Sequence, residues 1–271
     1  MAIFGDNGTL LAKQNSRGSR MKTSTSSNQL RNDRFLTNFL KPFRPTVPQP
    51  VTFVPRNQSR NKYRRWLSYC ISTDFKFNIT ERIVEVPFVF QNLRLPEHSR
   101  ILEFGCSQSL VSLQLASLGH DVSAVDVEDY PFSHPNLHFH KIDFLQNSFA
   151  DGYFDGAIAI SAIEHAGLGF YGDRCNEDGD RAVVQEIYRV LRKGGQFLLT
   201  APYGKKGASS WARVYDKPGL LELLGKFKIL AFRLFDGRGR EAWTVAEPDQ
   251  VAEVDSISTC QAVVCVVATK P

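Results

Sequence analysis

A short turn between an apolar stretch and a helical pattern carries the strongest chemical signal in this sequence. The stretch ends in Glu103-Phe104-Gly105-Cys106-Ser107, and a helical pattern follows shortly after. A turn from a strand into a helix presents free backbone N–H groups, and open α/β sheets bind ligands at the carboxyl ends of their strands. Gly105 allows a sharp turn and a close approach of the ligand to the backbone. The segment predicts a ligand-binding turn, and the alternative is a tight turn that binds nothing.

An acidic residue, Asp126, ends the next predicted strand. A carboxylate at this place can accept hydrogen bonds from two vicinal hydroxyl groups, such as those of a ribose. The alternative is an aspartate that is solvated at the end of its strand. Because the predicted ligand-binding turn lies one strand upstream, we favour contact with a nucleoside sugar.

Polar and ionisable side chains cluster after the fourth predicted strand. Ser161, Glu164 and His165 follow this strand. Ile163 lies between them, and Tyr171 stands in the glycine-rich loop beyond. The ordinary pKa of histidine lies near neutrality, so His165 is the candidate general base. The alternatives are that His165 only shapes a pocket and that Tyr171 packs within its own loop.

The strands that must position these residues follow from the spacing of apolar residues. Short apolar runs alternate with helical patterns, which is typical of an α/β sheet with helices on both faces. The predicted strands are Arg100–Phe104, 121–125, Leu137–Lys141, Phe154–Ile160, 196–200, 227–235 and Ala262–Thr269.

Two helices are predicted from apolar stripes at helical spacing. The stripe before the second strand is Val111, Leu115 and Leu118. The stripe before the fifth strand is Val183, Val184, Ile187, Val190 and Leu191. We expect Asp180 to cap the second of these helices and Gly194–Gly195 to end it. A third helix, over residues 77–93, is expected to be interrupted at Pro87.

The turn resembles the first motif of the class I S-adenosylmethionine-dependent methyltransferases, of the type 11-like kind, in which an acid precedes G-x-G-x-G. Glu103 and Gly105 match the acid and the first glycine. Ser107 and Ser109 stand at the places of the other two glycines. The spacing differs from the G-x-G-x-x-G of dinucleotide-binding turns. The resemblance spans about residues 83–270. It implies a Rossmann-like sheet of seven strands, mostly parallel, with an antiparallel last strand.

The resemblance also implies a cofactor, S-adenosyl-L-methionine, and the residues that hold it. The cofactor-contacting residues would be Glu103, Gly105, Ser107, Asp126, Asp143, Phe144 and Ser161. Those facing the acceptor would be Ile163, Glu164 and Tyr171. In this scheme Glu103 lies near the amino group of the cofactor, Asp126 binds the ribose and Asp143 lies at the adenine. The alternative for Asp143 is a plain loop residue.

The activity that the resemblance implies is transfer of a methyl group to an oxygen or nitrogen of a small molecule, a lipid or a sugar. One alternative is a domain that holds the cofactor or a partner without turnover, because two serines replace glycines in the motif. Another is an RNA methyltransferase guided by a basic tail. A nicotinamide-dependent oxidoreductase fits less well, because the turn lacks the dinucleotide spacing.

The chain divides near residue 65 into parts of opposite charge. Residues 1–66 hold 13 of the 33 Lys and Arg and two of the 28 Asp and Glu, which gives +11, and the remainder carries −6. Residues 1–65 are rich in Ser, Asn, Arg and Pro without apolar periodicity, which predicts a disordered tail and linker before a domain over 66–271. Such a tail can contact nucleic acid or an anionic surface, or direct import into an organelle. The alternative is a solvated tail without a ligand.

Other classes of protein and site are disfavoured. The apolar stretches are too short for a membrane span and the first residues form a poor secretory signal, so we expect a cytoplasmic protein unless the tail directs import. Five cysteines without a C-x-x-C pair argue against a disulfide framework. His134, His138 and His140 lack neighbouring cysteines or clustered acids to complete a set of ligands, so no metal is expected.

Overall fold

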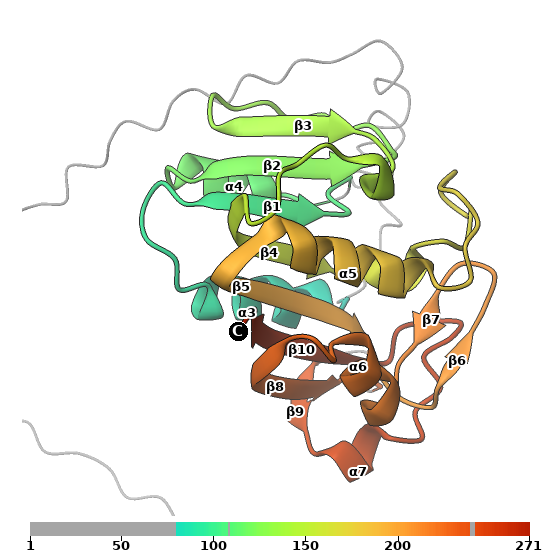
Figure 1. Ribbon diagram of the computed structural model, residues 1–271. Coiled ribbons are helices and arrows are strands. Elements are labelled where there is room, and N and C mark those ends of the chain that lie inside the picture. Colours follow the sequence, from blue (N-terminus) through green and yellow to red (C-terminus); the bar gives the residue numbers. More distant parts are fainter. Residues whose placement is uncertain (1–79, 108, 239–241) are drawn as a thin grey trace, which may run out of the picture. The chain divides into compact units, whose positions relative to one another are not determined.

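The computed structural model describes residues 80–107, 109–238 and 242–271 (Figure 1). The basic tail expected over residues 1–65 and the domain boundary expected at residue 66 lie outside these residues. In the part of the chain that is described, the search for a helix long and apolar enough to cross a membrane finds none.

The central feature is a mixed sheet of eight strands in the order β3-β2-β1-β4-β5-β10-β8-β9. The strands are β1 (Arg100–Phe104), β2 (Asp121–Asp126), β3 (Leu137–Lys141), β4 (Phe154–Ile160), β5 (Leu191–Pro202), β8 (Lys228–Asp236), β9 (Thr244–Ala246) and β10 (Ala262–Thr269). Strands β1 to β5 pair in parallel, whereas β10 is antiparallel to both β5 and β8. The Rossmann-like sheet with an antiparallel last strand is confirmed, and the short β9 adds an eighth strand at the edge.

Helices cover both faces of this sheet, as the sequence predicted (Figure 1). They are α3 (Arg82–Asn92), α4 (Val111–Ser117), α5 (Gly179–Val190), α6 (Lys217–Leu223) and α7 (Pro248–Val251), with the 3-10 turns η1 (Phe144–Gln146) and η2 (Ile163–His165). Alternate residues of a strand point to opposite faces. In β1, Leu102 packs in one core with Ile187 of α5, and Ile101 packs in the other with Leu115 of α4.

The helix ends differ from the predicted ones. Helix α4 stops at Ser117, so Leu118 at its C-cap is 65% exposed and does not continue the buried stripe. Helix α3 continues through Pro87. Helix α5 ends at Val190, and the chain enters β5 directly at Leu191, before the glycine pair that was expected to end the helix.

The expected N-cap of α5 is also wrong. The N-cap is Asp178, whose side chain makes no capping hydrogen bond. Asp180 lies inside the first turn, and its carboxylate accepts a hydrogen bond of 2.9 Å from the hydroxyl of Tyr215. Because this acid is 7% exposed, a tertiary partner has replaced the local capping role.

A small ribbon follows β5 and is separate from the main sheet. It consists of β6 (Gly207–Ala208) and β7 (Arg213–Val214). Strand β7 contacts both β5 and η2. The ribbon therefore lies beside the carboxyl end of β5 and next to the loop that follows β4.

Candidate active site

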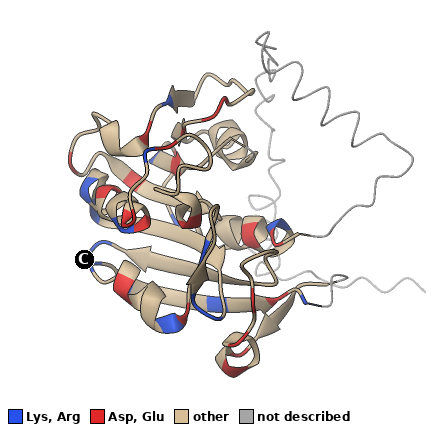
Figure 2. Ribbon diagram, turned by 90° about the vertical axis from the view of Figure 1, so that its right-hand side faces the viewer, with Lys and Arg blue, Asp and Glu red and all other residues tan. Residues whose placement is uncertain are grey.

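A cavity of about 290 Å³ opens at the carboxyl ends of the parallel strands. This is near the lower end of the range of about 300–1,000 Å³ that is typical of small-molecule sites. Its walls come from the turn after β1, the end of β2, η1, the loop after β4, the start of α3 and the ribbon β6–β7. Figure 2, turned toward this edge of the sheet, shows Asp and Glu positions on several of its loops.

The glycine of the turn is required by packing. Gly105 has φ +78° and donates its N–H to the carbonyl of Val125 at 2.9 Å. A Cβ atom at this position would overlap the Cβ atom of Ala162, which belongs to the loop after β4. The sequence predicted that the space beside the Gly105 Cα atom is open for a ligand, but the side chain of Ala162 fills it. Gly105 lines the cavity, and its close approach to Ala162 packs the turn after β1 against the loop after β4.

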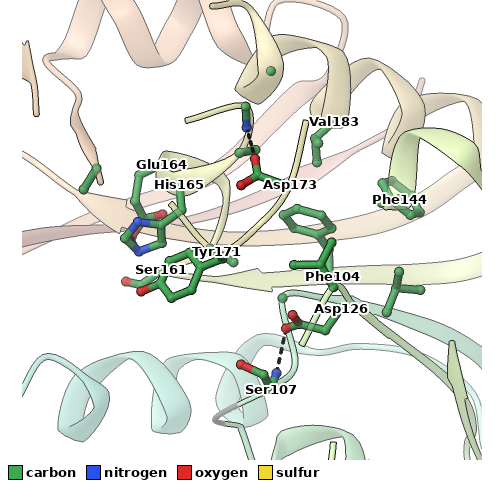
Figure 3. A pocket seen from close by; sticks show the side chains of 18 of the residues that line it. Phe104, Ser107, Asp126, Phe144, Ser161, Glu164, His165, Tyr171, Asp173 and Val183 are labelled. Atoms are coloured by element: carbon green, nitrogen blue, oxygen red, sulfur yellow. Dashed lines mark hydrogen bonds and ion pairs between the residues drawn. The ribbon is translucent and has the colours of Figure 1, made fainter. Parts of the chain in front are cut away.

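The carboxylate of Asp126 is oriented by two backbone groups. One oxygen accepts the N–H of Ser107 at 2.8 Å (Figure 3). The other oxygen accepts the N–H of Glu128 at 2.9 Å. Burial raises the pKa of Asp126, against the opposing effect of these hydrogen bonds. A carboxylate has about four lone pairs, so each oxygen can still accept a hydroxyl group from a ligand. The turn of β1 and the end of β2 thus form one binding wall.

Glu103 is buried behind the turn and does not itself line the cavity. Ser112 donates its hydroxyl to one carboxylate oxygen. The other oxygen is buried and has no hydrogen-bond partner among the described residues. Burial raises the pKa of this carboxyl group. Its expected contact with the amino group of a cofactor stays a prediction, and the unsatisfied oxygen is an acceptor for such a donor.

Asp143 and Phe144 belong to the part of the cavity wall that η1 forms. Asp143 caps η1 by accepting the N–H of Leu145 at 3.0 Å, and Phe144 packs against Phe104 with 5.5 Å between ring centroids. Both residues line the cavity. The arrangement offers an apolar ring face beside a carboxylate, and its contact with an adenine stays a prediction.

Ser161 lies at the bend after β4 with an unusual backbone conformation. Its φ of +40° is rarely adopted by residues other than glycine, and such strain is often found at functional sites. Its hydroxyl donates to the carboxylate of Glu85 at 2.6 Å, and Arg82 donates to the same carboxylate at 3.0 Å. Arg82 also lines the cavity. Sequence reasoning missed Arg82 and Glu85, because they are far from the motifs in sequence and carry no local signal.

Glu164 and His165 form the far end of the cavity. The Glu164 carboxyl group is fully buried, one oxygen has no partner among the described residues, and burial raises its pKa to about 8. His165 donates from Nδ1 to the carbonyl of Trp211, and its Nε2 atom lies 3.8 Å from Glu164 Oε1. Burial lowers the pKa of His165. Burial therefore favours the neutral forms of both Glu164 and His165.

Two aromatic rings flank this histidine. The ring of Trp211 stacks on the ring of His165 at 5.2 Å between centroids. Tyr171 meets His165 edge to face at 5.3 Å between ring centroids, and Figure 3 shows these two side chains near each other. Ile163 does not join them, because it is fully buried in the core and lies outside the cavity lining. The sequence assigned Ile163 to the acceptor pocket, and this placement corrects it. Trp211 was missed, since it stands in the ribbon some 46 residues away.

Arg213, in strand β7 of the ribbon, hydrogen-bonds to the loop after β4. Its guanidinium donates to the carbonyls of Ala166 at 2.7 Å and Glu177 at 3.0 Å, and lies 3.8 Å from the Asp180 carboxylate. Within the loop, Asp173 accepts the N–H of Gly167 at 2.6 Å. These contacts hold the segment that carries Glu164 and His165 in place.

The histidines considered as metal ligands lie elsewhere. His138 forms an ion pair with Asp121 at 2.9 Å, and the ring of His140 packs against Phe149. Among the described residues there is no group of three or more side chains arranged to hold a metal ion.

Comparison with known proteins agrees with this geometry. Residues 102–199 match a family model described as a methyltransferase domain. The solved structure of a 1,6-didemethyltoxoflavin-N1-methyltransferase from Burkholderia thailandensis, with bound S-adenosylhomocysteine, superposes with a TM-score of 0.50 at 16% identity, over 82% of this chain and 93% of that one. The family match over residues 102–199 and the shared fold support the resemblance to class I S-adenosylmethionine-dependent methyltransferases that the sequence predicted.

The curated relatives that match carry a different activity in their names. They are S-adenosyl-L-methionine-dependent Diels-Alderases of Neonectria sp. (strain DH2), 22% identical over 135 residues, and of Talaromyces variabilis, 29% identical over 120 residues. The matches cover 50% and 40% of this chain, and 51% and 37% of those relatives. The [4+2]-cyclase SpnF superposes with a TM-score of 0.51 at 17% identity, over 70% of this chain and 80% of that one.

Proposed function

We propose that this protein binds S-adenosylmethionine in the cavity and transfers its methyl group to a small organic acceptor. The observation that carries the proposal is that one cavity joins the wall at Asp126 to the polar end at Glu164 and His165. A nucleoside held at the first place would direct the rest of the cofactor toward the second.

Charged groups in the cavity wall and directly behind it fit the methionine part of this cofactor. An amino acid group carries both an ammonium and a carboxylate, and it needs partners of both signs. The guanidinium of Arg82 lines the cavity, and Glu103 has an unsatisfied carboxylate oxygen behind the turn. The serine at position 107 is compatible with the site as well, because its backbone N–H still orients Asp126.

When bound, the cofactor supplies an activated methyl group on a sulfonium, so the chain needs no electrophile of its own. The residues of the cavity bind and orient the two reactants and exclude water. Correct orientation alone can lower a barrier by roughly 7–11 kcal/mol. The aromatic side chains around His165 provide the dry surface that such alignment needs.

Two measurements on the full chain test the proposal. Calorimetry with S-adenosylmethionine and S-adenosylhomocysteine tests binding, and mass spectrometry of the purified protein identifies a ligand retained from the cell. A screen of acceptors with methyl-labelled cofactor then tests transfer. Failure to bind either nucleoside would refute the proposal, and binding without transfer would leave a cofactor-holding domain.

A second candidate function is a cofactor-dependent cyclisation. It is favoured by the names of the two curated relatives and by the buried carboxyl group of Glu164, which in its neutral form can donate a hydrogen bond to a polarised carbonyl. Cyclisation changes neither the mass of the substrate nor the cofactor. Methyl transfer adds a methyl group and forms S-adenosylhomocysteine, so product mass separates the two.

A further inference from the structure

We infer that Nε2 of His165 accepts a proton from the molecule that receives the methyl group. The neighbouring carboxyl group of Glu164 donates a hydrogen bond to that same molecule. We further infer that the acceptor is a neutral planar molecule with an ionisable hydroxyl group next to a conjugated carbonyl. This inference rests on the proposed methyl transfer and names the acceptor class for the same site.

The tautomer of His165 is set by the ribbon. A backbone carbonyl only accepts hydrogen bonds, so the Nδ1 atom that contacts the Trp211 carbonyl carries the hydrogen. A neutral imidazole then has its lone pair on Nε2. His165 lines the cavity. Its base-competent nitrogen is therefore fixed before any substrate binds.

The carboxyl group beside it favours the opposite role. Glu164 is fully buried, and its Oε2 atom has no partner among the described residues. An unpaired buried carboxylate is costly, so the protonated form is favoured and can donate through its O–H. The 3.8 Å between Nε2 and Oε1 is too long for a direct hydrogen bond. The O–H of Glu164, a hydrogen-bond donor, and Nε2 of His165, a hydrogen-bond acceptor, are thus neighbours that do not bond to each other.

Two of the charged groups around the pair, Arg213 and Arg82, have partners within the protein. Arg213 binds loop carbonyls and approaches Asp180, and Arg82 donates to Glu85 at 3.0 Å. Asp173 accepts the N–H of Gly167 through one carboxylate oxygen, and its other oxygen, Oδ1, is buried with no hydrogen-bond partner among the described residues. The rings of Trp211 and Tyr171 complete the surroundings. A neutral, flat acceptor fits this end better than an anion.

The complementary molecule has a hydroxyl group for Nε2 and a carbonyl oxygen for the Glu164 O–H. In the transfer step, the hydroxyl oxygen forms a bond to the methyl carbon while the carbon–sulfur bond breaks and its electron pair returns to sulfur. The hydroxyl proton passes to Nε2 of His165. The products are a methyl ether, S-adenosylhomocysteine and a histidine that returns its proton to water.

Nuclear magnetic resonance tests the state of His165 without any acceptor. Full-length protein labelled with ¹⁵N in its histidine rings would be recorded with S-adenosylhomocysteine, and His165→Gln would assign the signals. We expect hydrogen on Nδ1 and none on Nε2 at pH 7. A hydrogen on Nε2, or a doubly protonated ring at this pH, would overturn the inference.

An acceptor panel tests the chemical class. It contains a 2-hydroxyaryl ketone, the matched aryl ketone without the hydroxyl, an aliphatic alcohol and an aliphatic amine. We expect methylation of the first alone, with kcat/KM lowered on the order of 10²–10⁴-fold in His165→Gln. Glu164→Gln keeps a hydrogen-bond donor, so it should retain more kcat/KM than Glu164→Ala.

Binding of S-adenosylhomocysteine by each variant distinguishes a failure of the proposed function from a failure of the inference about His165 and Glu164. If the unmodified chain fails to bind it, the proposed function fails. If all variants bind it but the amine is methylated equally well by His165→Gln, the proposed function stands and the inference is wrong. Cofactor binding with no methylation of the hydroxyaryl ketone would also overturn the inference.

Discussion

The carboxylate of Asp126 accepts a backbone N–H on each oxygen, so its position is fixed before a ligand arrives. We expect Asp126→Ala to weaken binding of S-adenosylhomocysteine by about 1.5–3 kcal/mol, because charge-assisted hydrogen bonds to the ribose are lost. Calorimetry measures the change. Asp129→Ala is the matched control, since Asp129 is a nearby surface acid paired with Lys141. Unchanged affinity in Asp126→Ala would contradict the assignment.

The raised pKa of Glu164 predicts that the free energy of unfolding depends on pH. Its folded pKa of about 8 lies above the ordinary value of 4.5, so between these values the folded state holds a proton that the unfolded state has lost. This group therefore lowers the free energy of unfolding as pH rises from about 4.5 to 8. We expect Glu164→Gln to gain stability relative to the parent across this window, by several kcal/mol at most.

Denaturant unfolding of both proteins at pH 5 and pH 8 measures this difference. Groups that titrate alike in the two proteins cancel in the comparison. A stability difference that stays constant between the two pH values would show that Glu164 is ionised in the folded state.

At the scale of elements, the loop after β4 depends on the ribbon β6–β7 for its position. Arg213 makes this connection through several carbonyl oxygens and is 12% exposed in its side chain. We expect Arg213→Ala to lower the free energy of unfolding by about 1.5–3 kcal/mol, because charged hydrogen bonds are lost and the buried carboxylate of Asp180 loses a nearby positive charge. Catalytic transfer should fall further than cofactor affinity, since the loop carries the acceptor end.

Denaturant unfolding and calorimetry test this prediction together. Lys141→Ala is the control, because its ion pair with Asp129 is exposed and worth less than about 1 kcal/mol. If Arg213→Ala were as stable as this control, the ribbon would not be holding the loop.

At the scale of the whole molecule, charge separates the chain into a basic segment of +11 and a remainder of −6. We propose that residues 1–65 give the protein its affinity for nucleic acid or anionic surfaces. We expect deletion of residues 1–65 to abolish binding to a fluorescent RNA at 50 mM salt, and the full chain to lose affinity by 200 mM salt. Fluorescence anisotropy measures both. Equal affinity with and without the segment would refute the role, and calorimetry with S-adenosylhomocysteine controls for folding.

Much of the sheet could be predicted because its signals are local. Runs such as Phe154–Ile160 and Ala262–Thr269 carry their apolar pattern in consecutive residues, and the observed strands have those bounds. The turn at Gly105 and the acid at Asp126 follow directly from the ends of β1 and β2. Parallel neighbours bring such ends to one edge of a sheet, so this half of the cavity was foreseeable.

The acceptor end was decided by contacts between distant segments. Trp211 reaches His165 from the ribbon, and Arg82 reaches the bend after β4 from α3. No periodicity links such residues, because their proximity depends on how the whole sheet folds. The same reason explains why Ile163 turned inward and why Asp180 found Tyr215. The sequence by itself determined most of the sheet and the turn at Gly105, and only the tertiary structure decided which side chains meet around His165.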